Sequence, residues 1–203
     1  MADTPRDIHN RSQADMFDAL ADLFTRELPQ ETQRRLARIV AAAAPRPGES
    51  ILDVASGAGA LIPHMLPCRP ARIDACDLSP AMLARARERY PYVTFHQHDV
   101  IDLPGRIPPV DIVFCNSAFG NVYDQYQALL AMSRMLNPGG RLVISHSEGR
   151  RFHERLRKDR PDMVLHPLPE PEDGPSLLEQ AGLDFLSLTD EPALYILAGK
   201  KPA

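Results

Sequence analysis

The chain has 203 residues, of which 44% are hydrophobic and 25% charged, and its formal net charge is −4. These values fit one globular domain with a sizeable core, and they disfavour non-specific attraction to nucleic acid. The three cysteines are scattered without C-x-x-C spacing, so neither a disulfide framework nor a zinc site is indicated. Because no apolar leader or membrane-spanning run is visible, we expect a cytoplasmic protein.

The first 47 residues are expected to form two helices that precede the sheet. Apolar residues recur at helical spacing on one side of the first helix: Met16, Phe17, Leu20, Leu23, Phe24 and Leu28. A second helix follows Pro29 and stops before Gly48. These helices are predicted to cover the edge or one face of the sheet, and this is compatible with a second role as a lid over a ligand. We expect Phe17 and Phe24 to be core residues.

A glycine-containing turn follows the first predicted strand, which begins at residue 51 and ends on Asp53. Gly57 and Gly59 allow a sharp turn and the close approach of a ligand. The carboxylate of Asp53 would repel a pyrophosphate and would suit a ligand that carries a positive amino group. Ile62 occupies the place of the third glycine of the dinucleotide pattern. The turn therefore favours S-adenosylmethionine over NAD.

Two further acidic residues stand at the ends of the next predicted strands, residues 72–77 and 93–98. Asp77 is placed to accept both ribose hydroxyls of a nucleoside. Asp99 is placed to meet the adenine amino group, with the backbone N–H of Val100 donating to the ring. Between these strands, Ser79 caps a helix that begins at Pro80.

The remaining elements alternate between strand and helix. Their expected ranges are a strand at 111–115, a helix at 124–136, a strand at 142–145, a helix at 176–180 and a hairpin formed by 185–188 and 193–197. Asn116 and Ser117 follow the fourth strand at its carboxyl end. This order predicts strand–helix–strand units and a mostly parallel sheet.

Five segments together resemble the class I S-adenosylmethionine-dependent methyltransferases, of a small-molecule, type-11-like kind. They are residues 53–59, 77–83, 98–100, 110–116 and 136–142. A shorter likeness, at residues 119–124, is to the ubiquinone and menaquinone C-methyltransferases. The resemblance implies a cofactor site made of Asp53, Ala55, Ser56, Gly57, Gly59, Asp77, Leu78, Met82, Asp99, Val100 and Asn116.

The resemblance also implies a doubly wound, mostly parallel α/β sheet of seven strands, Rossmann-like, with an antiparallel last strand. We expect a single domain with four parts. They are a helical cap at 1–47, a cofactor-binding core at 48–146, a substrate loop and helix at 147–175, and a helix with a hairpin at 176–203.

The segment after the fifth strand is predicted to select the acceptor. His146 stands at the strand end and is our candidate general base, because an imidazole titrates near neutral pH. Arg150 and Arg151 are placed to bind an anionic group, since guanidinium pairs with such groups bidentately. Ser117 and Phe119 complete the expected acceptor site. His146, His153 and His166 match no metal-ligand spacing, so no metal is expected.

The sequence therefore predicts methyl transfer from S-adenosylmethionine to a small, soluble, plausibly anionic acceptor, without a membrane or nucleic-acid partner. Two alternatives stay open: a non-catalytic protein that binds S-adenosylmethionine, and, less favoured, an NAD-dependent oxidoreductase. The acceptor atom and the oligomeric state are not indicated by any motif.

Overall fold

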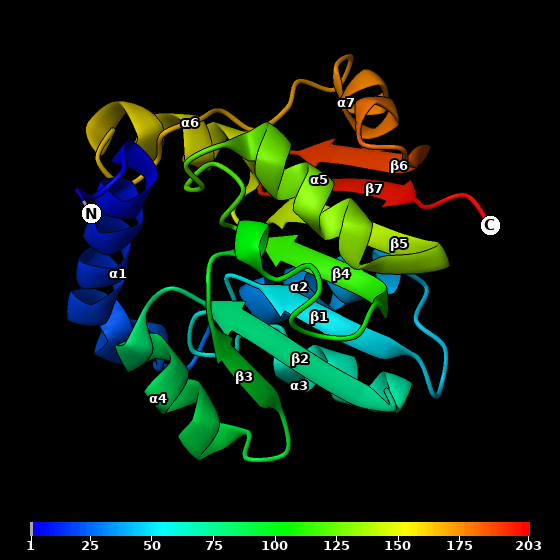
Figure 1. The fold of residues 1–203 in the computed structure, drawn as a ribbon, viewed down its shortest axis with the longest axis horizontal. Helices are drawn as coiled ribbons and strands as arrows, with labels where there is room; N and C mark the ends of the chain where they lie inside the picture. Colours follow the sequence, from blue (N-terminus) through cyan, green and yellow to red (C-terminus); the bar gives the residue numbers. More distant parts are fainter. Residues whose placement is uncertain (1) are drawn as a thin grey trace.

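The computed structural model describes residues 2–203, and in this part of the chain the strands form one seven-stranded sheet (Figure 1). The strands are β1 (Ser50–Val54), β2 (Arg72–Asp77), β3 (Thr94–Gln97), β4 (Val110–Asn116), β5 (Leu136–His146), β6 (Asp184–Glu191) and β7 (Leu194–Lys200). Their order across the sheet is β3-β2-β1-β4-β5-β7-β6.

The central strands are parallel, and the last two strands break that pattern. β1 pairs in parallel with β2 and β4, β2 with β3, and β4 with β5. β7 runs antiparallel to both β5 and β6. The predicted doubly wound sheet with an antiparallel last strand is therefore confirmed.

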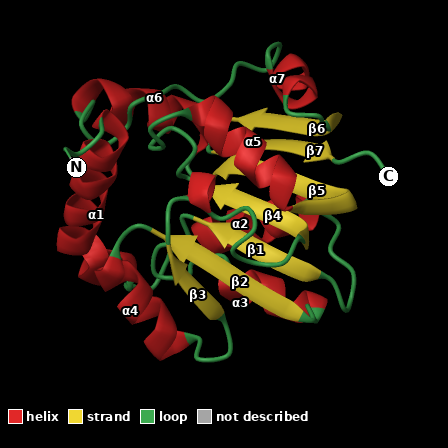
Figure 2. Ribbon diagram, viewed as in Figure 1, coloured by secondary structure: helices red, strands yellow, loops and turns green. Residues whose placement is uncertain are grey.

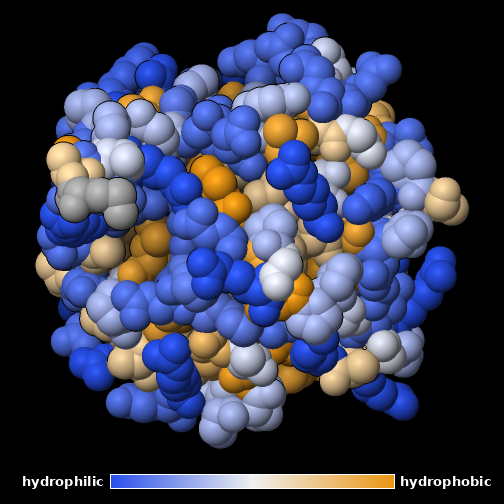
Figure 3. Space-filling model, in the orientation of Figure 1, coloured by the Kyte–Doolittle hydropathy of each residue, from blue (hydrophilic) through white to orange (hydrophobic). Residues whose placement is uncertain are grey.

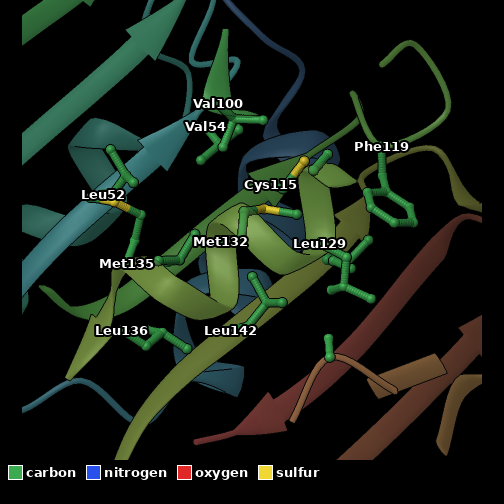
Figure 4. Packing of buried hydrophobic residues seen from close by; sticks show 14 of the residues in the cluster. Leu52, Val54, Val100, Cys115, Phe119, Leu129, Met132, Met135, Leu136 and Leu142 are labelled. Atoms are coloured by element: carbon green, nitrogen blue, oxygen red, sulfur yellow. The ribbon is translucent and has the colours of Figure 1, made fainter. Parts of the chain in front are cut away.

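Helices lie on both faces of the sheet (Figure 2). They are α1 (Pro5–Phe24), α2 (Gln30–Ala42), α3 (Ile62–Met65), α4 (Pro80–Arg89), α5 (Gln125–Met135), α6 (Gly149–Asp159) and α7 (Gly174–Gln180), with short 3-10 turns at Leu66–Cys68 and Val100–Asp102. Leu129 and Met132 of α5 pack on one face, close to Leu142 of β5 (Figure 4). Leu36 of α2 and Met65 of α3 belong to the core of the other face.

Helix α1 is the exception, because it packs on neither face. It crosses the carboxyl ends of the parallel strands, at the left in Figure 1, and contacts α4. Pro5 and a capping box between Thr4 and Asp7 fix its start. Phe24 of α1 is 48% exposed. Phe24 is therefore not a core residue, in contrast to the expectation, whereas Phe17 packs against a small core cluster that contains Ala21 and Met82.

Strand β5 is longer than residues 142–145, because its first residue, Leu136, already pairs with Val110 of β4 across an irregularity in the register. At the carboxyl end of β5, side chains alternate between the two sides of the sheet. Ile144 belongs to the core on the α5 face, so Ser145 points to the opposite side. His146, one residue further, faces the same side as Ile144.

The surface seen in Figure 3 is mainly hydrophilic, with separate apolar patches. Among the helices of residues 2–203, none has the length and apolar content that crossing a membrane requires.

Candidate functional site

The turn after β1 has the backbone conformation that its glycines predict. Gly57 and Gly59 have φ angles of 54° and 86°, and Ala55, which has a side chain, has a φ of 53°. A left-handed non-glycine residue is a strained conformation that often occurs at functional sites.

The two glycines serve different purposes. A methyl group added at Gly59 would lie 2.7 Å from Cε2 of Tyr90, so Gly59 permits close packing on the end of α4. A methyl group at Gly57 would meet only Sδ of Met82, at 3.9 Å. The space beside Gly57 is therefore open to a ligand.

The carboxylate of Asp77, at the end of β2, is held against this turn. Its Oδ2 accepts the backbone N–H of Gly57 at 2.8 Å, and its Oδ1 accepts the N–H of Ser79 at 2.9 Å. Burial raises the pKa of Asp77, although these hydrogen bonds oppose the shift. Each oxygen keeps a lone pair for a further donor, so Asp77 is orientated to bind hydroxyl groups.

Asp53 lies beneath the turn and is 2% exposed. Its Oδ2 is buried and has no hydrogen-bond partner within residues 2–203. Burial, with a smaller contribution from the charge of Asp77, raises the pKa of Asp53 to about 8. A buried acid without a partner is stabilised by an approaching cation, which suits a ligand with an ammonium group.

Asp99 is engaged by the N-terminal helix. Its Oδ2 accepts Nε of Arg6 at 2.9 Å and Nδ2 of Asn10 at 2.8 Å, while Oδ1 accepts the backbone N–H of Ile101 at 3.0 Å. Asp18 makes a second attachment, accepting the N–H of Ala81 at 3.0 Å. Helix α1 is thus fastened at two places over the strand ends.

A cavity of about 280 Å³ lies between the turn and the two N-terminal helices. From the sheet side it is lined by Ala55, Ser56, Gly57, Ala58, Ala60, Asp77, Leu78, Ser79, Met82, Asp99, Asn116, Ser117, Ala118, Asn121, Val122, Ser147 and Glu148. From α1 and α2 and their connection it is lined by Asn10, Gln13, Ala14, Phe17, Phe24, Leu28, Thr32 and Leu36.

The structure brings most of the predicted cofactor residues to this cavity. Eight of them line it: Ala55, Ser56, Gly57, Asp77, Leu78, Met82, Asp99 and Asn116. Asp53 and Gly59 do not line it, and the Val100 side chain belongs to the core (Figure 4). Three strand ends that are distant in sequence therefore meet at one place, as the parallel arrangement requires.

Asn116 and Ser117 form the part of the lining between β4 and β5. Oδ1 of Asn116 accepts Oγ of Ser145 at 3.0 Å, which fixes the amide. Ser117 has a φ of 57°, and its Oγ lies 3.4 Å from Oγ of Ser147. A second strained non-glycine residue thus borders the cavity.

Among the acceptor residues predicted from the sequence, Ser117 lines the cavity, whereas Phe119 and His146 do not. Phe119 is fully buried in the core on the α5 face. His146 lies on the far side of β5, where its ring packs 5.4 Å from the ring of His153. Burial lowers the pKa of His146 to about 3.

Arg150 and Arg151 also lie outside the cavity lining. Arg150 donates to Asp190 at 3.0 Å and forms ion pairs with Glu154 and Glu170, so three carboxylates surround it. The Arg151 side chain is exposed. The structure therefore places neither guanidinium beside the turn after β1.

Several lining residues were not predicted from the sequence. Asn10 and Glu148 line the cavity, and Arg6, which is not part of the lining, binds Asp99 together with Asn10. These contacts join distant segments: Arg6 and Asp99 are 93 residues apart, and Glu148 and its partner Arg35 are 113 residues apart. The spacing of polar residues along α1 is the one sequence signal, since Arg6, Asn10 and Gln13 recur at helical intervals.

The charged residues that line the cavity within residues 2–203 are all acidic: Asp77, Asp99 and Glu148. No group of three or more His, Cys, Asp or Glu side chains in this part of the chain is arranged to hold a metal ion. The cavity therefore has two unlike sides. We call the acidic side at the strand ends its floor, and the largely apolar side formed by α1, α2 and their connection its roof.

Comparison with known proteins gives a family model described as a methyltransferase domain, which matches residues 51–140. A demethylmenaquinone methyltransferase of Streptomyces griseus is 34% identical over 135 residues, covering 64% of this chain and 58% of the relative. The enzyme of the same name from Thermobifida fusca is 36% identical over 150 residues, covering 69% and 61%. The chain thus spans less than two thirds of the length of these relatives.

Solved structures share the fold at low identity. A magnesium protoporphyrin IX methyltransferase from Synechocystis has a TM-score of 0.70 at 17% identity, over 96% of this chain and 97% of that one. An N-methyltransferase from Bradyrhizobium japonicum has a TM-score of 0.70 at 15% identity, over 95% and 100%. Both were solved with S-adenosylhomocysteine.

Proposed function

Because the chain belongs to the class I S-adenosylmethionine-dependent methyltransferase family, we propose that it transfers the methyl group of S-adenosylmethionine to a small, uncharged acceptor. The observation that supports this most directly is the pairing of the Gly57 turn with Asp77 at one wall of the cavity. The cytoplasmic location expected from the sequence stays a prediction within this proposal.

The residues present fit the cofactor. The open space beside Gly57 and the unpartnered Oδ2 of Asp53 suit its amino-acid end, and Asp77 suits its ribose hydroxyls. Leu78 and Met82 offer apolar contacts, and Asp99 lies at the next strand end. The cofactor would supply a methyl group that its sulfonium makes electrophilic. The acid at Asp53 favours this ligand over NAD.

The chain itself contributes position and exclusion of water. Asp77 is fixed by two backbone N–H groups, so a bound ribose would be held in one orientation. Helices α1 and α2 close the cavity, since Phe17 and Leu36 line it from above. Holding reactants in a defined geometry is the main source of acceleration in a displacement of this kind.

An uncharged acceptor is better supported than the anionic one expected from Arg150 and Arg151. Those two residues do not line the cavity, and no Lys or Arg within residues 2–203 does. The apolar roof of Phe17, Phe24 and Leu28 suits a ring or chain of carbon. The relatives named demethylmenaquinone methyltransferases fit that chemistry.

Calorimetry with S-adenosylmethionine, S-adenosylhomocysteine and NAD tests the first half of the proposal. We expect both adenosyl ligands to bind and NAD to bind far more weakly. Tighter binding of NAD, or no binding of either adenosyl ligand, would overturn the proposal.

Turnover tests the second half and separates an enzyme from a non-catalytic binding protein. Formation of S-adenosylhomocysteine is measured with short-chain naphthoquinols, neutral phenols, amines and small carboxylic acids as acceptors. We expect turnover with uncharged ring compounds. Turnover with the carboxylic acids alone would overturn the uncharged acceptor and support the anionic acceptor predicted from the sequence.

A further inference from the structure

Glu148 contributes a carboxylate to the cavity wall two residues after the end of β5. Its Oε1 accepts Nη2 of Arg35 at 2.8 Å and Oγ1 of Thr32 at 3.4 Å, and both of these donors come from α2. Its Oε2 has no hydrogen-bond partner within residues 2–203. One oxygen is therefore anchored by the roof of the cavity, and the other is free to bind a ligand.

The place of Glu148 in the sheet separates it from the nucleoside half of the site. Asp77 ends β2, and the strand order puts β1 and β4 between β2 and β5. Three strand spacings correspond to roughly 14 Å. Glu148 is therefore too far from Asp77 to share the ribose. Ser147, which directly precedes it, lies at the other part of the lining, with its Oγ 3.4 Å from Oγ of Ser117.

The Glu148 side chain is accessible to solvent, unlike that of its partner. Arg35, which is the cation that faces it, is 13% exposed in its side chain, whereas the Glu148 side chain is 40% exposed. The lining contains two other acids. Asp77 lies at the end of the distant strand β2, and Asp99 forms an ion pair with Arg6 and accepts a hydrogen bond from Asn10. Within residues 2–203, no second carboxylate lines the part of the cavity where Glu148 lies.

We propose that Oε2 of Glu148 binds the O–H or N–H group of the acceptor and receives its proton, with Arg35 as a positioning residue. This inference rests on the proposed function, whose acceptor it narrows to a hydrogen-bond donor. The O–H or N–H bond breaks and leaves its electron pair on the heteroatom, which takes the methyl group. The proton goes to Oε2 and then to solvent. In a quinol this pair is shared with the adjacent ring carbon, which takes the methyl group instead and then loses its own hydrogen as a proton.

The same geometry explains why His146 does not take this role. Its Nδ1 accepts the backbone N–H of Glu148 at 3.2 Å, so the histidine orientates the loop that carries the carboxylate. The ring lies on the other side of β5, outside the cavity lining.

The test uses para-nitrophenol as a probe, because its absorbance reports whether its hydroxyl is ionised. The probe is titrated with pH while bound to protein saturated with S-adenosylhomocysteine. A neighbouring carboxylate disfavours the ionised probe. We therefore expect the pKa of the bound probe to be about one unit higher in the native protein than in Glu148→Gln.

Two variants serve as controls. Glu148→Asp retains a carboxylate and should restore part of the shift. Glu191→Gln removes a glutamate that pairs with Arg38 of the same helix α2 at 2.7 Å, but outside the cavity lining, so it should leave the shift unchanged. Thermal unfolding of each variant establishes that the protein is folded.

A structural role and a proton-accepting role give different results. If Glu148 only holds Arg35, Glu148→Gln lowers the melting temperature and leaves the pKa of the bound probe unchanged, which overturns the inference. Turnover adds a second readout. Glu148→Gln should lower kcat at least 100-fold at neutral pH, and the kcat of the variant should rise again at high pH, where the acceptor ionises in solution.

The proposed function fails independently of this inference. It fails if the native protein does not bind S-adenosylhomocysteine at all. The inference alone fails if that ligand binds normally to every variant and the probe titrates identically in the native protein and in Glu148→Gln.

Discussion

The backbone N–H of Gly57 donates to Oδ2 of Asp77 at 2.8 Å, which joins the turn after β1 to the end of β2. The acid thus supports the turn, and under the proposed function it also binds the ribose. Because the hydrogen bond spans two strands, a change at Asp77 alters the shape of the cavity as well as its charge. This relationship leads directly to the first prediction.

Asp77→Ala should weaken S-adenosylmethionine binding by about 1.5–3 kcal/mol, because charge-assisted hydrogen bonds to the ribose are lost. Calorimetry measures the change. Asp22→Ala removes an exposed acid that pairs with Arg85 on the same end of the molecule, and it should have no effect. Equal affinities in native protein and Asp77→Ala would remove Asp77 from the binding site.

Gly57→Val should abolish cofactor binding, because its side chain occupies the open space at the turn and φ is 54°. The strain of a positive φ costs about 1–3 kcal/mol of stability. Gly105→Val is the matched control, since Gly105 has a φ of 84° and no atom within 4 Å of an added methyl group. That variant should be destabilised but should bind normally. If both variants bind S-adenosylmethionine equally well, the turn does not form part of the cofactor site.

His153→Leu should stabilise the protein by about 1 kcal/mol at neutral pH. Both ring nitrogens of His153 are buried without a partner, so an apolar side chain removes two unpaired polar atoms. Chemical denaturation measures the gain. A loss of stability would mean that the imidazole makes a contact with water or a ligand that compensates its burial.

The same variant should change the response to acid. Burial lowers the pKa of His153 to about 4, below its unfolded value of about 6.5. Between these values the unfolded chain binds a proton that the folded chain does not, so stability falls as the pH drops from about 6.5 to about 4. In His153→Leu this fall should be smaller, with the share of His146 remaining. An identical slope in both proteins would contradict the assignment.

Arg6→Met should loosen α1 without altering the core, because it removes the charged contact to Asp99. This ion pair is partly exposed, so its loss should cost about 1 kcal/mol. Amide exchange should then be about fivefold faster in the first half of α1, while β1 and β4 keep their rates. Arg11→Met, which removes a more exposed pair with Asp3, is the control. Unchanged exchange in Arg6→Met would show that α1 is held by its other contacts.

The meeting of the proposed cofactor residues at one cavity could be predicted from the sequence, because parallel strands end at one edge of the sheet. Asp53, Asp77 and Asp99 follow successive strands, so their meeting depends only on strand order. Asn116 follows the same rule. Family resemblance supplied the antiparallel last strand, which no periodicity along the chain indicates.

The acceptor half could not be predicted in the same way, because it depends on which side of a strand each residue faces and on distant partners. His146 and Glu148 are two residues apart, yet only Glu148 lines the cavity. Arg150 is surrounded by Glu154, Glu170 and Asp190, and the last two follow it by 20 and 40 residues. The division into four segments and the acceptor roles of Phe119 and Arg151 stay predictions.

Helices α1 and α2 close the cavity from Pro5–Phe24 and Gln30–Ala42, and both precede β1 in the chain. During synthesis on the ribosome, the helices that form the roof of the cavity are therefore made before the strand ends that form its floor. Phe17, Phe24 and Leu28 leave the exit tunnel well before Ser147 and Glu148 are synthesised, and their final neighbours do not yet exist. The nascent chain thus carries an exposed apolar stripe through most of its synthesis. During that interval, the stripe is a binding site for a chaperone that shields apolar segments.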